Sequence, residues 1–185
     1  MQQSSFNTQL SLFQKLKNFD FILLFCIMTL GVMSAFSMYS TDGGEILFHS
    51  KSHITKFLIF FPMMIILSFL DIKFWHYFSY VFYIICLAFL IWASLYGIKA
   101  SGSQRWINLY FINLQPSELM KIAVIACLAK YYHRIGLDKV NTIQSLSIVL
   151  TILILPIMLV VSQPDLGTSI LIASSGLVVM WLAGL

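Results

Sequence analysis

The chain has 185 residues, of which 59% are hydrophobic and only 10% charged, and its mean hydropathy is +0.90. Soluble domains carry about 25% charged residues, so a soluble single domain is excluded, and the high apolar content excludes an intrinsically disordered chain. The formal net charge is +4. No clustered basic patch accompanies it, so we expect contact with lipid headgroups and no nucleic-acid binding. The composition predicts an all-α, polytopic membrane helix bundle.

Uncharged stretches divide the chain into about six predicted transmembrane spans, because one spanning helix needs about 20 residues. A polar cytoplasmic tail precedes them at residues 1–18, and residues 19–185 are expected to form a single transmembrane domain. Polar connections are expected at residues 42–56 and 99–118. The spans are predicted at residues 20–41, 55–70, 74–98, 116–132, 141–163 and 166–185.

The sixth predicted span runs to Leu185 without the polar or basic residues that usually anchor a helix end in the headgroup layer. We therefore expect this chain to be part of a longer membrane protein, or to work with a second piece. Basic residues divide almost evenly between the two sides of the membrane. Charge alone therefore favours a cytoplasmic N-terminus only slightly.

Two Gln-Pro-acid clusters flank the hairpin that the fourth and fifth spans are predicted to form. Gln115-Pro116-Ser117-Glu118 opens this hairpin and Gln163-Pro164-Asp165 closes it, so both clusters are expected at the same membrane face. The connection that carries Arg105 leads directly into the first cluster. The topology therefore predicts that four charged residues converge at one interface: Arg105, Glu118, Lys121 and Asp165.

The start of the fourth span has the pattern of a helix N-terminus. Pro116 suits the first helical position, and a carboxylate in the first turn, here Glu118, is favoured by the helix dipole. Glu118 and Lys121 lie at i and i+3, so they can pair and allow Lys121 to lie inside the membrane edge. Ionisable residues at this depth indicate a function. An ion pair that only fixes helix packing is the alternative.

The second cluster has the pattern of an interrupted helix. Pro164 restricts its predecessor to extended geometry, Gly167 permits a close turn, and Asp165 and Thr168 can cap the next helix. Such broken helix ends form substrate sites in membrane carriers. Plain capping of the turn is the alternative.

Arg105 beside Trp106 suits an anionic headgroup, because a guanidinium forks onto phosphate and an indole favours the membrane interface. An ordinary aromatic-belt pair is the alternative.

His49 and His53 have i, i+4 spacing without a third ligand nearby, so no metal site is expected. Three cysteines inside apolar stretches are expected to pack in the core: Cys26, Cys86 and Cys127.

Three sequence blocks resemble the SEDS family (shape, elongation, division and sporulation) of bacterial cell-wall polymerases. They are Ser101-Gly102-Ser103-Gln104-Arg105-Trp106-Ile107, Gln115-Pro116-Ser117-Glu118-Leu119-Met120-Lys121 and Gln163-Pro164-Asp165-Leu166-Gly167-Thr168-Ser169-Ile170-Leu171. The third block resembles the elongation branch, RodA, more than the division branch, FtsW. The resemblance covers nearly the whole chain and implies the N-terminal half of a fold of about ten spans.

The resemblance implies a membrane peptidoglycan glycosyltransferase of cell elongation and shape that polymerises lipid II. In this reaction a sugar hydroxyl attacks an anomeric carbon and undecaprenyl pyrophosphate leaves. It also implies a multi-pass protein of the bacterial inner membrane with a cytoplasmic N-terminus. The implied partner is a class B penicillin-binding protein transpeptidase within an elongation complex. No cofactor is implied, and a divalent cation is left open.

By the same resemblance, Arg105 and Lys121 would bind the pyrophosphate, whose charge grows as it leaves. Glu118 would position Lys121, and Asp165 with Thr168 would shape the floor of the cavity. Further substrate contacts are expected from Trp106, Gln115 and Ser117, and the motif turns from Pro116, Pro164 and Gly167.

The family's presumed general base is an Asp in a large extracellular loop after the seventh span, which lies beyond this chain. No residue here is therefore assigned as catalytic. Two other functions stay open. One is a lipid flippase or transporter in which the Glu118–Lys121 pair gates translocation, and the other is a non-catalytic scaffold for a cell-wall transpeptidase.

Overall fold

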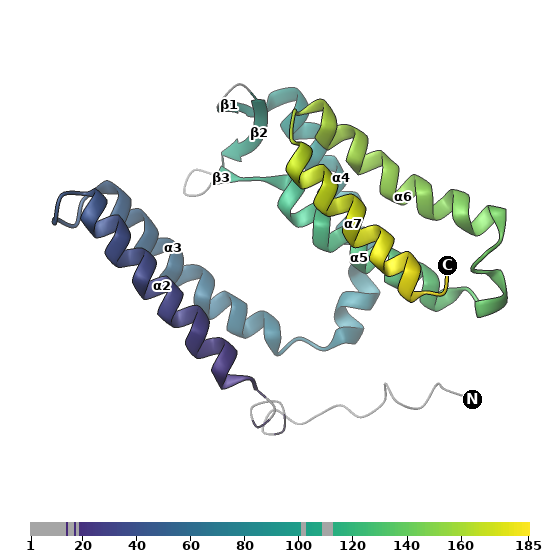
Figure 1. The fold of residues 1–185 in the computed structure, drawn as a ribbon, viewed down its shortest axis with the longest axis horizontal. Helices are drawn as coiled ribbons and strands as arrows, with labels where there is room; N and C mark the ends of the chain where they lie inside the picture. Colours follow the sequence, from purple (N-terminus) through teal and green to yellow (C-terminus); the bar gives the residue numbers. More distant parts are fainter. Residues whose placement is uncertain (1–13, 15–16, 18, 101–102, 109–112) are drawn as a thin grey trace. The chain divides into compact units, whose positions relative to one another are not determined.

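The computed structural model describes residues 14, 17, 19–100, 103–108 and 113–185 (Figure 1). Within these residues the chain forms six α-helices, three short strands and one 3-10 turn. The tail predicted at residues 1–18 lies outside the described residues, apart from positions 14 and 17. The chain separates into two compact units, residues 1–71 and 72–185. We call them the hairpin unit and the bundle unit.

The hairpin unit consists of α2 (Phe21–Thr41) and α3 (Phe48–Ser68). α2 contains no charged residue, and its N-cap is Asp20, whose carboxylate accepts a hydrogen bond from the Leu23 amide at 3.0 Å. A side-chain acceptor at this position satisfies one of the helix's unpaired N–H groups. α2 therefore begins and ends within one residue of the predicted first span.

α3 begins seven residues earlier than the predicted second span, within the stretch expected to be a polar loop. The Asp42 carboxylate accepts two hydrogen bonds from Ser50 in the first turn of α3, from its amide at 2.7 Å and its hydroxyl at 2.6 Å. These bonds stabilise a polar first turn, which apolar content alone does not predict. The helix thus starts at Phe48 and includes residues that hydropathy assigned to the loop.

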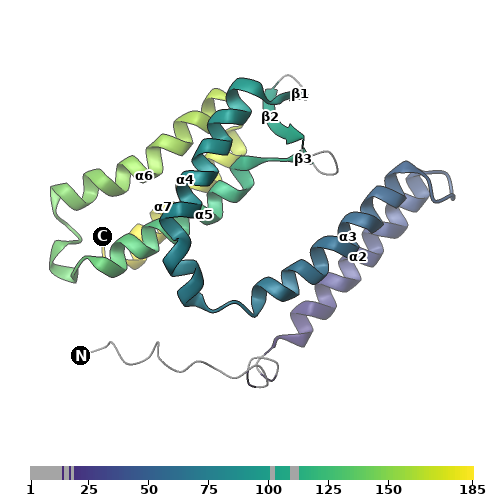
Figure 2. The ribbon, with the colours of Figure 1, turned by 180° about the vertical axis from the view of Figure 1, so that it is seen from behind.

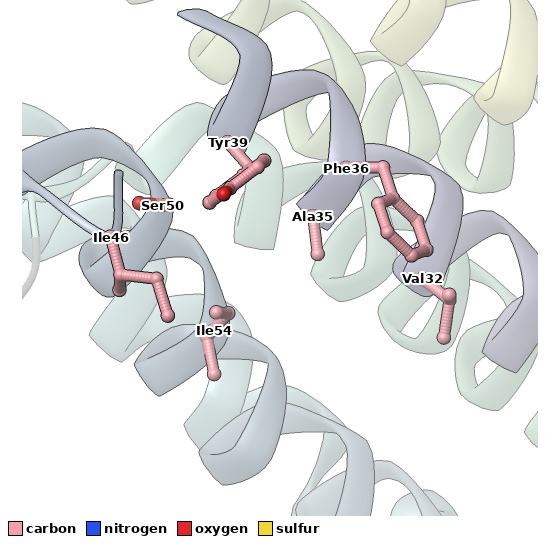
Figure 3. Close-up of a pocket in the computed structure, with 7 residues that line it drawn as sticks. All are labelled: Val32, Ala35, Phe36, Tyr39, Ile46, Ser50 and Ile54. Carbon is pink, nitrogen blue, oxygen red and sulfur yellow. The ribbon is translucent and has the colours of Figure 1, made fainter. Parts of the chain in front are cut away.

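α2 and α3 approach closely at Gly31, where an added Cβ would overlap the Phe57 ring. Nearer the turn the two helices leave an open groove of about 320 Å³ (Figure 3). Only Tyr39 and Ser50 bring side-chain oxygens to its lining, and Asp42 already binds the Ser50 hydroxyl. The groove is lined by Val32, Ala35, Phe36, Tyr39, Ile46, Ser50 and Ile54.

The bundle unit packs four helices side by side, with a small sheet at one end (Figures 1 and 2). α5 contacts each of the other three helices. The unit comprises α4 (Ile72–Tyr96), β1 (Ile98–Ala100), β2 (Ser103–Asn108), β3 (Asn113–Leu114), α5 (Pro116–Arg134), η1 (Leu137–Lys139), α6 (Ile143–Ser162) and α7 (Leu166–Leu182).

Each of the four helices contributes fully buried side chains to one apolar core: Leu90, Met120, Leu128, Val149 and Ile172. α6 and α7 meet closely at Gly176, where an added Cβ would overlap the Leu153 side chain. A larger residue at this position would therefore have to displace the Leu153 side chain from the packed core. The core places the ends of α4, α6 and the starts of α5 and α7 at the same end of the bundle.

The sheet was not predicted from the sequence, which indicated only a polar connection over residues 99–118. It is antiparallel with the order β1-β2-β3, and Ile98 pairs with Trp106 while Ile107 pairs with Leu114. Strands of two to six residues are too short to show a convincing alternation of apolar and polar side chains. Their backbone pairing nevertheless fixes β2 against the helices that carry the motif residues.

Among the described residues, four helices are long and apolar enough to cross a membrane: α2, α3, α4 and α6. α7 is apolar but has 17 residues. α5 is long enough but carries charges at both ends, with Glu118 and Lys121 near its start and Lys130 and Arg134 near its end. The six predicted spans match these six helices to within three residues, except at the start of α3.

Candidate functional site

Three segments that are distant in sequence meet at the sheet end of the bundle: β2, the start of α5 and the turn between α6 and α7. They bring Arg105, Gln115 and Asp165 into contact. The prediction that Arg105 and Asp165 converge is confirmed, since Arg105 Nη1 lies 3.6 Å from Asp165 Oδ2. We call these three residues and Gln163 the Asp165 cluster.

Asp165 is the centre of this cluster and is 9% exposed. Its Oδ2 accepts a hydrogen bond from Gln115 Nε2 at 3.1 Å, and its Oδ1 accepts one from the Thr168 amide at 3.3 Å. Asp165 is therefore the N-cap of α7, as predicted, and also the acceptor for groups from β2 and α5. A buried carboxylate needs such partners, because an unpaired charge is costly to desolvate.

Arg105 binds the turn between α6 and α7 through three nitrogen atoms. Its Nε donates to the Gln163 carbonyl at 3.2 Å and its Nη2 to the Pro164 carbonyl at 3.1 Å, while Nη1 faces Asp165. A guanidinium has five N–H donors, so the two hydrogen bonds leave three, including both on Nη1, which lies beyond hydrogen-bond distance of Asp165. Arg105 thus holds the turn in place, and its charge is already balanced by Asp165.

Two residues that the sequence analysis did not select also hold this corner together. Gln163 is 4% exposed, and its side-chain amide donates to the Leu90 carbonyl of α4 at 3.3 Å. The Ser169 hydroxyl donates to the Asp165 carbonyl at 2.7 Å. A signal for Gln163 was available, because it occupies the same place in the second Gln-Pro-acid cluster as Gln115 does in the first.

The predicted Glu118–Lys121 pair is confirmed, with Lys121 Nζ 2.8 Å from Glu118 Oε2. The Glu118 side chain is 55% exposed and that of Lys121 25%, whereas the Asp165 and Arg105 side chains are 11% and 29% exposed, so the two pairs differ in the exposure of their carboxylates and not of their cations. In the part of the chain that the structure describes, no hydrogen bond or ion pair joins this pair to Asp165. The four charged residues expected to converge thus form two separate pairs, Glu118 with Lys121 on α5 and Arg105 with Asp165.

Other predicted contact residues lie deeper than expected. Ser117 is 1% exposed, and its hydroxyl has no protein partner among the described residues. Thr168 is 8% exposed. Trp106 is half-buried and follows Arg105 on β2. The pairing of β2 with β1 skips Arg105, because Trp106 pairs with Ile98 and Gln104 with Lys99.

The motif turns follow the prediction at two of three positions. Pro116 is the first residue of α5, and Pro164 lies in the turn between α6 and α7. Gly167 is instead helical, in the first turn of α7, and an added Cβ there would meet nothing within 4 Å. The prediction of a close turn at Gly167 is therefore wrong, because Gln163 and Pro164 make the turn and Asp165 already starts the helix.

Within the described ranges, no group of three or more His, Cys, Asp and Glu side chains is arranged to hold a metal ion. Cys86 and Cys127 are buried in the bundle and Cys26 is exposed, all as free thiols. The Asp165 cluster offers hydrogen-bond donors, one carboxylate and one guanidinium. Glu118 is the more accessible of the two acids at this end, and the Arg105 and Lys121 side chains are similarly exposed.

Curated relatives share sequence with most of the chain. The peptidoglycan glycosyltransferase MrdB of Escherichia coli K12 is 32% identical over 166 residues, which cover 90% of this chain and 44% of MrdB. The probable peptidoglycan glycosyltransferase FtsW of Buchnera aphidicola from Baizongia pistaciae is 27% identical over 176 residues, which cover 91% and 46%. The chain thus spans about half the length of the curated relatives that it matches.

Solved structures share the fold. The rod shape determining protein RodA of Thermus thermophilus superposes with a TM-score of 0.77 at 21% identity, over 91% of this chain and 55% of RodA. A chain from a peptidoglycan synthase complex that coordinates polymerization and crosslinking gives the same TM-score at 20% identity, over 90% and 48%. With its spanning helices, the chain is a multi-pass membrane protein. Residues 16–185 match the FtsW/RodA/SpoVE family of cell cycle proteins, and the chain belongs to that family.

Proposed function

We propose that the chain forms the N-terminal part of a membrane peptidoglycan polymerase of cell elongation, which transfers glycan between lipid II molecules. The observation that carries the proposal is the Asp165 cluster, in which residues from all three sequence blocks meet at one end of the bundle. The names of the curated relatives, which are peptidoglycan glycosyltransferases, support the same reaction.

The two polar groups at this end have different roles in the proposed reaction. Arg105 and Asp165 neutralise each other and hold the turn between α6 and α7, so they position the site. Lys121 is 25% exposed and donates a hydrogen bond to Glu118, so it can offer its other N–H groups to the pyrophosphate of a lipid substrate, whereas Arg105 is engaged by the turn. Negative charge grows on the departing undecaprenyl pyrophosphate, and a fixed ammonium stabilises that charge.

The buried residues contribute indirectly. Ser117 and Thr168 lie beneath the surface, and Gln115 is engaged with Asp165. We therefore place them behind the substrate surface, where they fix the starts of α5 and α7. The general base of the reaction is expected from the remainder of a family member, and a divalent cation with the pyrophosphate is compatible with the proposal but not required by it.

The proposal includes location and partner. The chain lies in the bacterial inner membrane with its N-terminus in the cytoplasm, which puts the Asp165 cluster at the outer face. There it would receive lipid II and release undecaprenyl pyrophosphate. A class B penicillin-binding protein transpeptidase of the elongation complex would crosslink the product. The solved complex that combines polymerization with crosslinking supports such a pairing.

The test is a lipid II polymerisation assay with the purified chain, alone and together with the C-terminal part of a family member. Glycan strands that form only with both parts would support the proposal. Movement of lipid II across vesicles without any polymer would favour the flippase. Stimulation of crosslinking by a transpeptidase, without glycan polymer and without movement of lipid II, would favour the scaffold.

Lys121→Met tests the proposed role of Lys121 in binding the pyrophosphate. In a family member completed as above, we expect polymerisation to fall at least tenfold, because the pyrophosphate loses a counter-charge that is worth several kcal/mol at such sites. Lys139→Met removes a lysine at the other end of the bundle and is the matched control. Wild-type polymerisation by Lys121→Met would reduce the Glu118–Lys121 pair to a packing role.

A further inference from the structure

The opposite end of the bundle carries a group of cationic and aromatic side chains that the proposed reaction does not use. They come from the start of α4 and the end of α5, which pack side by side. We call them the basic–aromatic cluster: His76, Tyr77, Tyr80, Lys130, His133 and Arg134.

Lys130 is the fixed member of this cluster. Its Nζ donates to the Tyr77 carbonyl at 2.8 Å and lies 4.6 Å from the centre of the Tyr80 ring. The Tyr77 ring centre is 5.9 Å from the same nitrogen. An ammonium has three N–H donors, so Lys130 is held in position by one hydrogen bond and two ring faces and still has donors to offer.

The other basic side chains of the cluster lie around His76. His133 lies edge to face with His76, with ring centres 5.1 Å apart. The charges that act on His76 are those of His133, Lys130 and Arg134. Arg134, the last residue of α5, is exposed and also interacts with the Tyr80 hydroxyl. Like charges gathered this closely repel one another, so an anion between them is favoured.

We propose that the basic–aromatic cluster binds the phosphate of an anionic phospholipid headgroup. Basic pockets between the ends of membrane helices bind anionic headgroups, and a guanidinium can fork onto phosphate oxygens.

Exposed aromatic rings beside the cluster point to a lipid and not a free phosphate. Phe74, Tyr77 and Phe78 form a chain of contacts along α4, with ring centres 4.7 and 5.0 Å apart, and all three are exposed. Such rings suit the boundary between headgroups and acyl chains.

The experiment measures binding of single lipids to the purified 185-residue chain in an uncharged detergent, by native mass spectrometry. The probes are dioleoyl phosphatidylglycerol and dioleoyl phosphatidylcholine. We expect the chain to retain phosphatidylglycerol preferentially and Arg134→Gln to weaken that binding about fivefold, the factor that one interfacial charge provides. Lys139→Gln, which removes a cation from η1 at the same end of the bundle, should leave it unchanged.

Arg134→Lys keeps the positive charge but removes the paired N–H groups of the guanidinium. It should give an affinity for phosphatidylglycerol between those of the wild-type chain and Arg134→Gln. Circular dichroism of each variant shows whether α5 is intact, so a loss of binding through unfolding is recognised. Equal retention of the two lipids by the wild-type chain would overturn the proposal. So would equal weakening by Arg134→Gln and Lys139→Gln, or displacement of the lipid by millimolar inorganic phosphate.

Discussion

Each of the two units has one aspartate, Asp42 or Asp165, whose carboxylate accepts hydrogen bonds that hold a turn. The two aspartates differ in how far along the chain their partners lie. In the hairpin unit, Asp42 accepts two hydrogen bonds from Ser50, eight residues further along the chain. In the bundle unit, the partners Arg105 and Gln115 are 60 and 50 residues away from Asp165. Asp42 fixes one local turn, whereas Asp165 joins a strand and two further helix ends.

This difference separates a structural cap from a residue that organises a site. Loss of a local cap is confined to one helix end. Loss of a residue that several elements share leaves each partner unsatisfied in a half-buried corner, where the cost of an unmade hydrogen bond is highest. The two aspartates should therefore respond very differently to the same substitution.

Asp165→Asn should have the largest effect. The change keeps the shape of the side chain but removes the charge opposite Arg105, which is 29% exposed at its side chain. We expect the free energy of unfolding to fall by about 2–3 kcal/mol, since hydrogen bonds to charged groups are in this range. Unfolding in mixed micelles of a mild detergent and sodium dodecyl sulfate measures it.

Asp138→Asn is the matched control for this prediction, because Asp138 is exposed on η1. It should change the unfolding free energy by less than about 0.5 kcal/mol. Equal effects of the two substitutions would mean that Asp165 is no more than another polar residue at a helix end.

Arg105→Lys should have an intermediate effect. Lysine keeps the positive charge near Asp165 but cannot reach the carbonyls of Gln163 and Pro164 at the same time. We expect a loss of about 1 kcal/mol in the same unfolding measurement, from one or two weakened hydrogen bonds. A loss as large as that of Asp165→Asn would show that the fork, and not the charge, holds the corner.

Asp42→Asn should have the smallest effect on stability, and this effect should depend on pH. The hydrogen bonds from Ser50 lower the pKa of Asp42 below its usual 3.8. A carboxylate with a depressed folded pKa stabilises the fold fully above its unfolded pKa, and this contribution is lost as pH falls through the lower folded value. The wild-type turn should therefore loosen below about pH 4, and Asp42→Asn should remove that dependence.

Hydrogen exchange over residues 43–52, corrected for the intrinsic rate at each pH, measures this loosening. Glu45→Gln removes another carboxylate from the same turn and should keep the wild-type pH dependence. An Asp42→Asn variant that still loosens with the wild-type profile would assign the effect to another group.

The sequence predicts the helices well because uncharged stretches and prolines mark most of their ends. It also predicts the meeting of Arg105 with Asp165, since hairpin topology alone brings the two Gln-Pro-acid clusters to one face. It does not predict the start of α3, which depends on a side-chain bond from Asp42, nor the short sheet, whose strands are held by backbone pairing. Burial of Ser117 and the engagement of Arg105 depend on packing between elements, which no local pattern encodes.

α5 is tied at both of its ends to other parts of the bundle. Gln115, its N-cap, binds Asp165 at one end, and Lys130 binds the Tyr77 carbonyl of α4 at the other. The helix therefore cannot slide along its axis without breaking one of these bonds. Its 19 residues, about 28 Å long, set a fixed spacing between the two polar ends of the bundle. A thicker or thinner bilayer would then be met by tilting of the whole bundle or by deformation of the lipid around it.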